Sequence, residues 1–546
     1  MAYIEIDKKE FEELLGEKIS SEKLEHEASF LGAHWNHEEG DTWDVEVYPN
    51  RPDLLSVEGL ARAYRGFFNI DKGLPNYTVN EGEINVNVDS SVEEVRPYIG
   101  GAVVRELELT EDVIDNLIQL QEKLHQTMGR RRDKLAIGLH DLSELDPDFT
   151  YTAVKPDEVS LIPLGKSKEM QLGEILENHE KGRDYSWILE DHEKYPIIKD
   201  SEDRVLSFPP IINNQLTEVD SKTSEIFIDV TGKDKQTVHT CLNIIVTALA
   251  ERGGRIDSVN IEGEQLPDLT SSRIELETEY AKNVSGLELS KEEIGELLEK
   301  MNYGVKYGEE IGVDIPSYRT DVMHQYDLIE DMVIAYGYKN IEPEIPEIDQ
   351  ISEQKPVEKF TDVVRDILVG VGAMETQTYI LSNKDKLFGR MEKEEEEIAE
   401  MDNALTSDYT AVRNWLMPSQ LEVLKQNKHH SYPQKFFEAA DVVELDSSSV
   451  GARNVRKLVY LESDNSVDFT DAKQVIQVLE RDLGLSFEVK TDQKPFFKEN
   501  RSADLFLNGK KVGFIGEISR EVLENWELEK EVTGFELDLE KIQSLK

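Results

Sequence analysis

A proline-rich and acid-rich stretch, IEPEIPEIDQISEQKP at residues 341–356, divides this chain. It contains three prolines and five acidic residues, a composition typical of a linker. The chain has 546 residues, which is too long for one hydrophobic core. We therefore expect separately folded domains on both sides of the stretch.

Acidic side chains dominate the composition along the whole length. Asp and Glu number 113 against 61 Lys and Arg, which gives a formal net charge of −52. Such a distribution suits concentrated salt, because the Debye length falls to ~3 Å at 1 M and screens the self-repulsion. We therefore expect a protein from a halophile. The alternative is a merely acidic protein from an ordinary cytoplasm.

Signals for export and for membrane insertion are missing from the sequence. The first residues, MAYIEIDKKEFEELLG, lack an apolar signal core. The most apolar run, CLNIIVTALA at 241–250, is short for a membrane span and predicts a buried helix. Cys241 is the one cysteine, which excludes an internal disulfide and a Cys-based zinc site. We expect a soluble, cytoplasmic protein with no membrane partner.

Strand and helix patterns follow one another along the chain and predict an α+β multidomain protein. A turn-rich boundary falls at residues 71–91, and strands such as EIFIDVTG alternate with helices such as EDVIDNLIQLQEKLHQTM after it. The expected domains are residues 1–85, 92–265, 268–345 and 357–546.

Four carboxylates crowd into RTDVMHQYDLIEDMVIAYGY at residues 319–338: Asp321, Asp327, Glu330 and Asp331. The last three stand at helical i, i+3 and i+4 positions and share one face. Oxygen ligands without Cys suit Mg²⁺. The alternative is a capping box, with Asp327 at the N-cap and Glu330 at N3. The spacing leaves both interpretations open, and Gly337 is expected to end the helix.

Two further patterns bear on nucleic-acid binding and on domain history. The basic segments GRRRDK (129–134) and KQNKHH (425–430) could contact phosphate, although solvated loops are the commoner fate of such runs.

The stretches at 50–64 and 318–336 share Arg-x-Asp and then a helix that closes on Ala-Tyr. This echo suggests two related small domains, with chance similarity as the alternative.

Several motifs together resemble the beta subunit of phenylalanine–tRNA ligase in its archaeal and eukaryotic form. They occur in the order that the family has: NRPDLLSVEGLARAYRGF, LSFPPIINNQ with FIDVTGKD, the Asp321 stretch with AYGYKNI, and NALTSDYTAVRNWLMPSQLEVLKQNKHH with FFEAADVV.

This resemblance implies a small N-terminal domain at 1–85, an α/β editing domain at 92–265 and a winged-helix-like metal domain at 268–345. It also implies a class II synthetase-like antiparallel domain at 357–546. The family assigns Asp321, Asp327, Glu330 and Asp331 to Mg²⁺. By the same resemblance, the editing pocket for mischarged Tyr-tRNA contains Ser207, Asn213, Asp229 and Thr231.

The last domain departs from catalytic class II cores, which need Arg-x-Glu and Gly-x-Gly-x-x-Arg for ATP. Arg413-Asn-Trp stands in place of the first motif, and FIGEISRE has one glycine. Without those cations the charge that develops on the adenylate is not stabilised. We therefore expect no catalytic residues for aminoacylation here. The resemblance implies a catalytic alpha subunit that binds ATP, in a tetramer of two alpha and two beta chains that acts on tRNA(Phe).

Two rival functions remain open at this stage. One is a stand-alone nucleic-acid-binding or regulatory protein built from synthetase domains. The other is a stand-alone Tyr-tRNA hydrolase that keeps the last domain as a relic.

Overall fold

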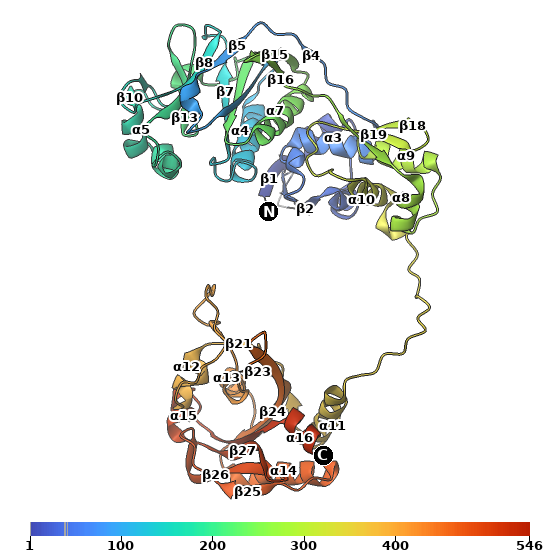
Figure 1. Ribbon diagram of the computed structural model, residues 1–546, viewed down its shortest axis with the longest axis vertical. Helices are drawn as coiled ribbons and strands as arrows, with labels where there is room; N and C mark the ends of the chain where they lie inside the picture. The colour runs from blue at the N-terminus through green and yellow to red at the C-terminus, as the bar shows by residue number, and fades with distance from the viewer. Residues whose placement is uncertain (1, 38–39, 41) are drawn as a thin grey trace. The chain divides into compact units, whose positions relative to one another are not determined.

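The computed structural model describes residues 2–37, 40 and 42–546. The chain forms two compact units, Met1–Glu344 and Ile345–Lys546 (Figure 1). Residues 342–355 contain neither helix nor strand and are exposed. This segment falls within the proline-rich stretch, where alternating prolines and acids oppose regular hydrogen bonding.

The chain begins with a three-stranded antiparallel sheet in the order β1-β3-β2. Helices α1 and α3 pack against each other beside it. Helix α3 begins at Val57, a few residues after Asp53, because Ser56 is its N-cap. The Oγ atom of Ser56 accepts a hydrogen bond from Gly59 N. The elements are β1 (Ala2–Asp7), α1 (Lys8–Leu15), β2 (Ala33–His37), β3 (Thr42–Val47) and α3 (Val57–Phe67).

A mixed sheet of eleven strands forms the middle of this unit, in the order β13-β12-β11-β8-β5-β15-β6-β14-β7, with β4 and β16 paired to β15. Three pairings are parallel, β15–β4, β15–β5 and β5–β8, and the other pairings are antiparallel. The expected α/β arrangement is therefore corrected to α+β. The strands are β4 (Val79–Asn80), β5 (Asn85–Val88), β6 (Tyr98–Arg105), β7 (Leu135–Asp141), β8 (Phe149–Val154), β11 (Tyr195–Lys199), β12 (Val205–Phe208), β13 (Ile212–Asn213), β14 (Ile226–Gly232), β15 (Arg255–Ile261) and β16 (Glu264–Leu266).

Two long helices cover this sheet, α4 (Glu111–Gln126) and α7 (Lys235–Ala250). Helix α7 carries the apolar run that starts at Cys241, and it packs on β6 and β14 with a continuous buried face. The prediction of a buried helix is confirmed there. Strands β4 and β5 lie at the turn-rich boundary expected from the sequence, yet they pair with the sheet.

The first unit ends in a small antiparallel sheet, β17-β19-β18, with three helices. Helix α10 carries the acid-rich stretch and ends at Gly337, whose φ of 91° lies in the region that favours glycine. This part comprises β17 (Ser272–Leu276), α8 (Thr278–Ser285), α9 (Lys291–Lys300), β18 (Gly304–Tyr307), β19 (Ile311–Ile315) and α10 (Gln325–Tyr336).

The second unit is a seven-stranded sheet in the order β20-β23-β24-β28-β27-β26-β25, antiparallel except for β20–β23. Helices α11, α14 and α16 share one hydrophobic cluster with the sheet, and α13 and α15 share another. The elements are α11 (Pro356–Gly370), β20 (Met374–Glu375), α13 (Met417–Asn427), β23 (Gln434–Leu445), β24 (Ala452–Asp464), α14 (Phe469–Leu483), β25 (Glu488–Thr491), β26 (Phe497–Leu507), β27 (Lys510–Ile518), α15 (Arg520–Asn525), β28 (Glu531–Asp538) and α16 (Leu539–Leu545).

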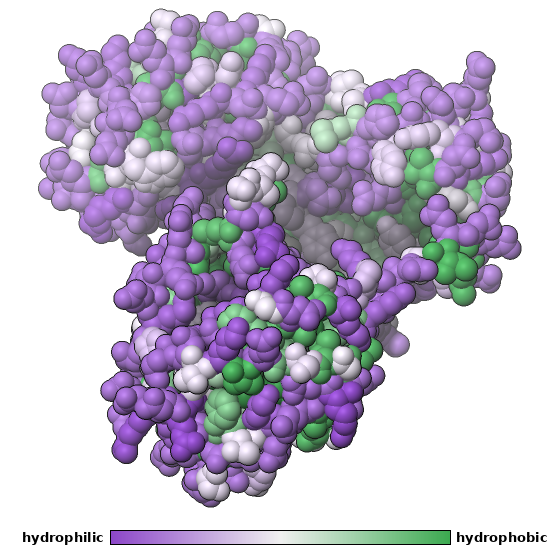
Figure 2. Space-filling model, turned by 60° about the horizontal axis from the view of Figure 1, so that its bottom comes forward, coloured by the Kyte–Doolittle hydropathy of each residue, from purple (hydrophilic) through white to green (hydrophobic). Residues whose placement is uncertain are grey.

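The two faces of this sheet follow from strand alternation. On β24, Leu458 and Tyr460 belong to one cluster, while Val459 and Leu461 belong to the other. Successive side chains of a strand point to opposite faces, so both faces are buried. The face of the molecule shown in Figure 2 is largely hydrophilic, with scattered hydrophobic residues. Within the described residues, none of the helices combines the length and the apolar character that crossing a bilayer requires.

Candidate functional site

A cavity of about 640 Å³ lies in the first unit, among α4, β7, β12, β13 and β14. Three of the four predicted editing residues line it: Ser207, Asn213 and Asp229. Apolar side chains from α4 and from residues 209–212 supply much of the remaining wall. A largely apolar cavity with a few convergent polar groups is the usual form of a small-ligand site.

Asp229 sits in the middle of β14 with 1% of its surface exposed. Its Oδ2 lies 2.8 Å from His140 Nε2, and His140 Nδ1 lies 2.8 Å from Thr217 Oγ1. In the part of the chain that the structure describes, Asp229 Oδ1 accepts no hydrogen bond. One oxygen therefore fixes the carboxylate, and the other is available to a ligand.

Gly138 makes room for this carboxylate. It is the direct neighbour of Asp229 in the β7–β14 register. A Cβ added at Gly138 would lie 1.9 Å from Asp229 Oδ2, so any other residue would displace the side chain. Neither Gly138 nor His140 was predicted as a site residue from the sequence. The signal was present in LAIGLHD, because a glycine inside a strand marks a close approach.

Ser207 and Asn213 face each other across the β12–β13 pair. Ser207 Oγ donates to Asn213 Oδ1 at 3.0 Å, and Asn213 Nδ2 donates to the carbonyl oxygen of Leu139 at 3.2 Å. The hairpin and β7 are thereby joined at the cavity wall. These bonds fix the amide orientation, which a bound polar group would require.

Thr231 has a different environment from the other three residues. It is fully buried and is absent from the cavity lining. Its Oγ1 accepts from Arg96 Nε at 3.0 Å, and its carbonyl oxygen accepts from Arg96 Nη2 at 3.0 Å. Arg96 also donates to the carbonyl oxygens of Arg132 and Asp133, each at 3.1 Å. Thr231 therefore anchors the GRRRDK segment instead of facing the cavity.

Arg96 carries its charge inside the protein at a cost. Burial lowers the pKa of its guanidinium to about 10. It forms no ion pair within the described chain, and four oxygens of the backbone and of Thr231 satisfy it instead. A buried cation satisfied by carbonyls is a strong structural tie between β14 and the loop.

His125 and Glu122 of α4 extend the polar part of the cavity. Burial lowers the pKa of His125 to about 4, and its Nε2 accepts a hydrogen bond of 2.8 Å from Ile137 N. Its Nδ1 lies 3.5 Å from Glu122 Oε1. Burial disfavours the charge on Glu122, but His125 and Arg132 lower the pKa of Glu122 to about 2. The imidazole is therefore neutral at pH 7.

The acid-rich stretch is organised around Arg319. This side chain makes a two-pronged ion pair with Asp321, at 2.8 Å for both bonds, and its Nη2 lies 2.8 Å from Asp331 Oδ2. Tyr303 also donates to Asp331. Burial opposes the charge of Arg319, but Asp331, Tyr303 and Asp321 together raise the pKa of its guanidinium. Two of the four carboxylates therefore already have a cation.

Asp327 caps α10, but not in the predicted way. The helix begins one turn earlier, with His324 as the N-cap, and Asp327 is at N3. Its Oδ2 accepts from Met323 N and His324 N, each at 2.8 Å. The predicted pair of Asp327 at the N-cap and Glu330 at N3 is wrong, because the His324 ring already satisfies the Tyr326 amide.

Glu330 is the one member of the quartet without a hydrogen bond or ion pair inside the described chain. Partial burial and then Asp331, Asp327 and Asp321 raise the pKa of its carboxyl. Among residues 2–37, 40 and 42–546, no three His, Cys, Asp or Glu side chains converge as metal ligands would. As they stand, these residues fit at most a cation that keeps most of its waters, as Mg²⁺ does.

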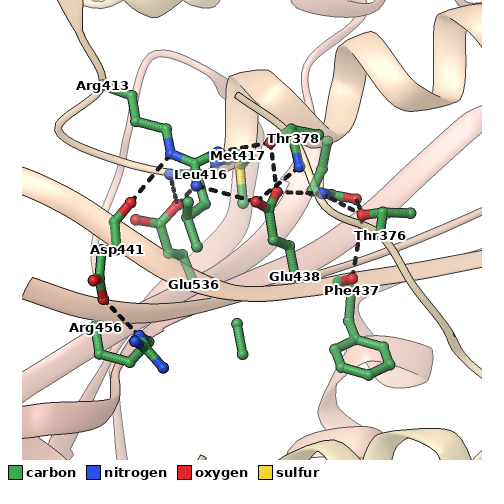
Figure 3. A network of polar contacts seen from close by, with 12 residues as sticks. Thr376, Thr378, Arg413, Leu416, Met417, Phe437, Glu438, Asp441, Arg456 and Glu536 are labelled. Carbon is green, nitrogen blue, oxygen red and sulfur yellow. Dashed lines mark hydrogen bonds and ion pairs between the residues drawn. The ribbon is translucent and has the colours of Figure 1, made fainter. Parts of the chain in front are cut away.

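In the second unit, Arg413 is fully occupied by the protein (Figure 3). Its Nη2 lies 3.0 Å from Glu438 Oε1, its Nη1 donates to Thr378 Oγ1 at 2.6 Å, and its Nε donates to the carbonyl oxygen of Asp441 at 3.3 Å. Both partners of the ion pair are 2% exposed. All three guanidinium nitrogens of Arg413 therefore bind atoms of the protein itself.

A second buried carboxylate completes this network. Glu536 Oε2 accepts from Leu416 N and Met417 N, each at 2.9 Å, at the start of α13. Burial raises the pKa of Glu536, while Lys457 and these amides oppose the shift. The polar residues of this region hold α13 against the sheet.

Known proteins match this chain over almost its whole length. The family of the phenylalanyl tRNA synthetase beta chain CLM domain matches residues 341–539, the tRNA synthetase B5 domain matches 274–338, and the B3/4 domain matches 105–259.

Similar proteins are archaeal beta subunits of phenylalanine–tRNA ligase. The Pyrococcus furiosus subunit is 41% identical over 99% of this chain and 100% of its own length. The Archaeoglobus fulgidus subunit is 41% identical over 93% of both chains. A crystal structure of an N-terminal fragment of the Pyrococcus horikoshii subunit covers 62% of this chain and all of the fragment, at 42% identity and a TM-score of 0.59. This chain belongs to the family of phenylalanine–tRNA ligase beta subunits.

Proposed function

We propose that this beta subunit hydrolyses tRNA mischarged with tyrosine in the 640 Å³ cavity, and that a separate alpha subunit charges tRNA(Phe) with phenylalanine. The observation that carries the first part is Asp229, a buried carboxylate with one oxygen on His140 and the other without a partner in the described structure. A carboxylate of this kind accepts the hydrogen bond of a phenol.

The selectivity has a physical basis. An apolar pocket for phenylalanine rejects tyrosine by only ~10², because tyrosine merely adds a hydroxyl. A second site that needs the hydroxyl discriminates in the opposite direction, since phenylalanine leaves its buried polar groups unpaired. Asp229 would bind the phenol, and Ser207 with Asn213 would orient the ester. Thr231 would contribute indirectly, through Arg96.

The test uses the assembled enzyme. Asp229→Ala should slow hydrolysis of preformed Tyr-tRNA by about 10²-fold and leave synthesis of Phe-tRNA intact. Asp257→Ala is the matched control, because Asp257 is a buried strand carboxylate of the same sheet outside the cavity lining. Equal losses in both variants would indicate damage to the sheet. Unchanged hydrolysis in Asp229→Ala would place the reaction elsewhere.

The buried network of the second unit supports the proposed dependence on an alpha subunit. Arg413 is bound to Glu438 and Thr378 and is withheld from ATP. Large apolar side chains are exposed nearby in sequence, including Met374 at 64%, Tyr379 at 76% and Leu405 at 101%. Exposed apolar groups of this size suit burial against another chain. We infer a tetramer with two alpha and two beta chains.

Aminoacylation provides the test of this division of labour. The isolated chain should show no phenylalanine-dependent exchange between ATP and pyrophosphate, with Mg²⁺ present, and addition of the alpha subunit should restore charging. Exchange activity in the isolated chain would overturn the assignment. Recovery of the chain from lysate without a partner would favour a stand-alone protein.

We also propose that Asp327 and Glu330 bind Mg²⁺ through water, with Asp321 and Asp331 close by on Arg319. Support comes from the raised pKa of Glu330, which burial and three neighbouring carboxylates cause. When bound, the ion would supply positive charge that relieves this repulsion. Its role would be structural, because these residues do not line the hydrolytic cavity.

A further inference from the structure

A second cleft of the first unit, of about 910 Å³, has an unusual lining for this chain. Its charged lining residues are Lys123, Arg130 and Lys134, and no acidic residue occurs among the described residues that line it. Asp and Glu make up 113 of the 546 residues, so a wall of this size without one is notable. Tyr3 and Tyr48 also line the cleft and are 48% and 41% exposed.

The loop at residues 129–134 forms one wall of this cleft. Arg130, Arg131 and Arg132 have φ values of 46°, 58° and 67°, in the left-handed region that side chains of this size rarely adopt. Arg96 holds the loop in this form through the carbonyl oxygens of Arg132 and Asp133. Strained backbone that a buried side chain maintains is commonly found at functional sites.

The three arginines of the loop point to different uses. Arg132 is buried, lines the hydrolytic cavity and donates to the carbonyl oxygen of Ile211 at 2.9 Å. Arg130 and Arg131 are exposed, and within the described structure neither guanidinium makes an ion pair or a hydrogen bond.

In the other basic segment, two lysines share one glutamate of the same chain. In KQNKHH, Lys425 lies 2.7 Å from Glu527 and Lys428 lies 4.0 Å from the same side chain. With almost two acids per basic residue, local neutralisation is readily available. Arg130 and Arg131 of the loop at 129–134 have no such partner among the described residues, so their guanidinium groups are available to an anion from outside the chain.

The cleft and the hydrolytic cavity are adjacent. Gln126 lines both of them, and the loop separates them, with Arg130 on the cleft side and Arg132 on the cavity side. A flexible strand that lies in the cleft could therefore place its end in the cavity.

We propose that the cleft binds the single-stranded 3′ end of the aminoacylated tRNA and directs it to the cavity. Lys123 and Arg130 of the lining bind its phosphates together with Arg131, which follows Arg130 in the loop, and Tyr3 and Tyr48 stack on its bases. Spaced cations with interleaved aromatic rings are what single-stranded RNA requires, whereas a free anion needs no rings. This inference rests on the proposed hydrolysis of Tyr-tRNA in the adjacent cavity.

The experiment compares two substrates of the assembled enzyme, Tyr-tRNA and the ester 3′-tyrosyl-adenosine, which lacks phosphates. Arg130→Gln with Arg131→Gln should raise KM for Tyr-tRNA about tenfold or more and leave hydrolysis of the small ester unchanged. The slope of log affinity for tRNA against log salt should become shallower by about 1.4, since each contact to a single strand contributes ~0.7.

Two control variants separate charge from structure. Arg130→Lys with Arg131→Lys keeps both charges and should retain most of the affinity for Tyr-tRNA. Lys168→Gln with Lys222→Gln removes two exposed cations outside both cavities and should change neither KM nor the slope.

The outcomes distinguish tRNA binding in the cleft from Tyr-tRNA hydrolysis in the cavity. A wild-type KM and salt slope in the Gln variant would overturn the cleft assignment while the hydrolytic function stands. Equal losses on both substrates would also overturn it, because the loop would then only support the cavity. If the wild-type enzyme hydrolyses neither substrate, the proposed function fails and the cleft assignment fails with it.

Discussion

The cavity around Asp229 and the network around Arg413 are made of similar residues but differ in how completely the protein satisfies them. Asp229 has one oxygen on His140 and the other without a partner among the described residues. Arg413 uses each of its three nitrogens on the protein, and its partner Glu438 also accepts from Gln420 at 2.9 Å. The first arrangement leaves capacity for a ligand, and the second does not.

This difference separates a site from a scaffold. Buried polar groups must be hydrogen-bonded, so a fully satisfied network stabilises one arrangement of the core. A buried polar group that has an unpaired hydrogen-bonding atom beside a cavity can bind a ligand there. Buried charge alone therefore does not identify function in this protein.

The largest expected effect is on the closed network. Arg413→Met should lower the free energy of unfolding of the second unit by about 3–5 kcal/mol, because Glu438 is left buried and unpaired. Urea unfolding followed by tryptophan fluorescence measures this change. Arg520→Met is the control and should leave the unfolding free energy nearly unchanged, since its pair with Glu524 is exposed. Lost aminoacylation with unchanged stability would instead make Arg413 a catalytic group.

The open cavity should be sensitive to acid. His125 is neutral in the fold with a pKa of about 4 against 6.5 in the unfolded chain. The unfolded state therefore binds the proton first, and stability falls as pH drops from 6.5 to 4, by about 3 kcal/mol. In His125→Gln this contribution should be absent, which pH-dependent unfolding of both proteins will show. Parallel curves for the two proteins would mean that the imidazole is not buried in solution.

Variants of Thr231 test whether this predicted site residue lines the cavity or only supports its lining through Arg96. Thr231→Val removes the acceptor of Arg96 Nε and should cost about 1–3 kcal/mol of stability. Hydrolysis of 3′-tyrosyl-adenosine should fall less than in Asp229→Ala. Thr231→Ser keeps the hydroxyl and should behave like the wild type. A loss of activity as large as that of Asp229→Ala, without a loss of stability, would mean that Thr231 contacts the ligand directly.

The acid-rich stretch is intermediate, with two carboxylates satisfied and Glu330 open. If Mg²⁺ binds, tenfold excess over its Kd should stabilise the wild type by about 1.4 kcal/mol. Asp327→Asn with Glu330→Gln should abolish this response and, without Mg²⁺, should be slightly more stable. Thermal unfolding at fixed high KCl measures both. An identical response of the two proteins to millimolar Mg²⁺ would exclude the ion.

Local patterns predicted much of the fold. The buried helix at Cys241, the linker after residue 341 and the end of α10 at Gly337 depend on residues that are adjacent in sequence, and the structure has all three. The parallel or antiparallel character of the large sheet depends on pairings between residues more than 150 positions apart, such as β5 with β15. No local pattern encodes such a pairing.

The candidate site divides in the same way. Ser207, Asn213 and Asp229 were predicted because short motifs around them resemble those of a known family, and they line one cavity. The sequence did not predict His140, Gly138 or Arg96, because the role of each depends on a partner from a distant strand. Arg96, which donates to Thr231, is an example. Similarly, Arg319 could not be recognised as the cation that binds both Asp321 and Asp331, because only the fold of α10 brings Asp331 to it.

The exposed segment at residues 342–355 would couple the proposed hydrolysis kinetically to the charging reaction. A flexible tether of this length extends to at most about 50 Å. A partner bound to the second unit would therefore encounter the first unit at an effective concentration in the millimolar range instead of by free diffusion. A mischarged product released by a bound catalytic partner would be recaptured before it could reach the ribosome, even if the hydrolytic cavity bound it weakly.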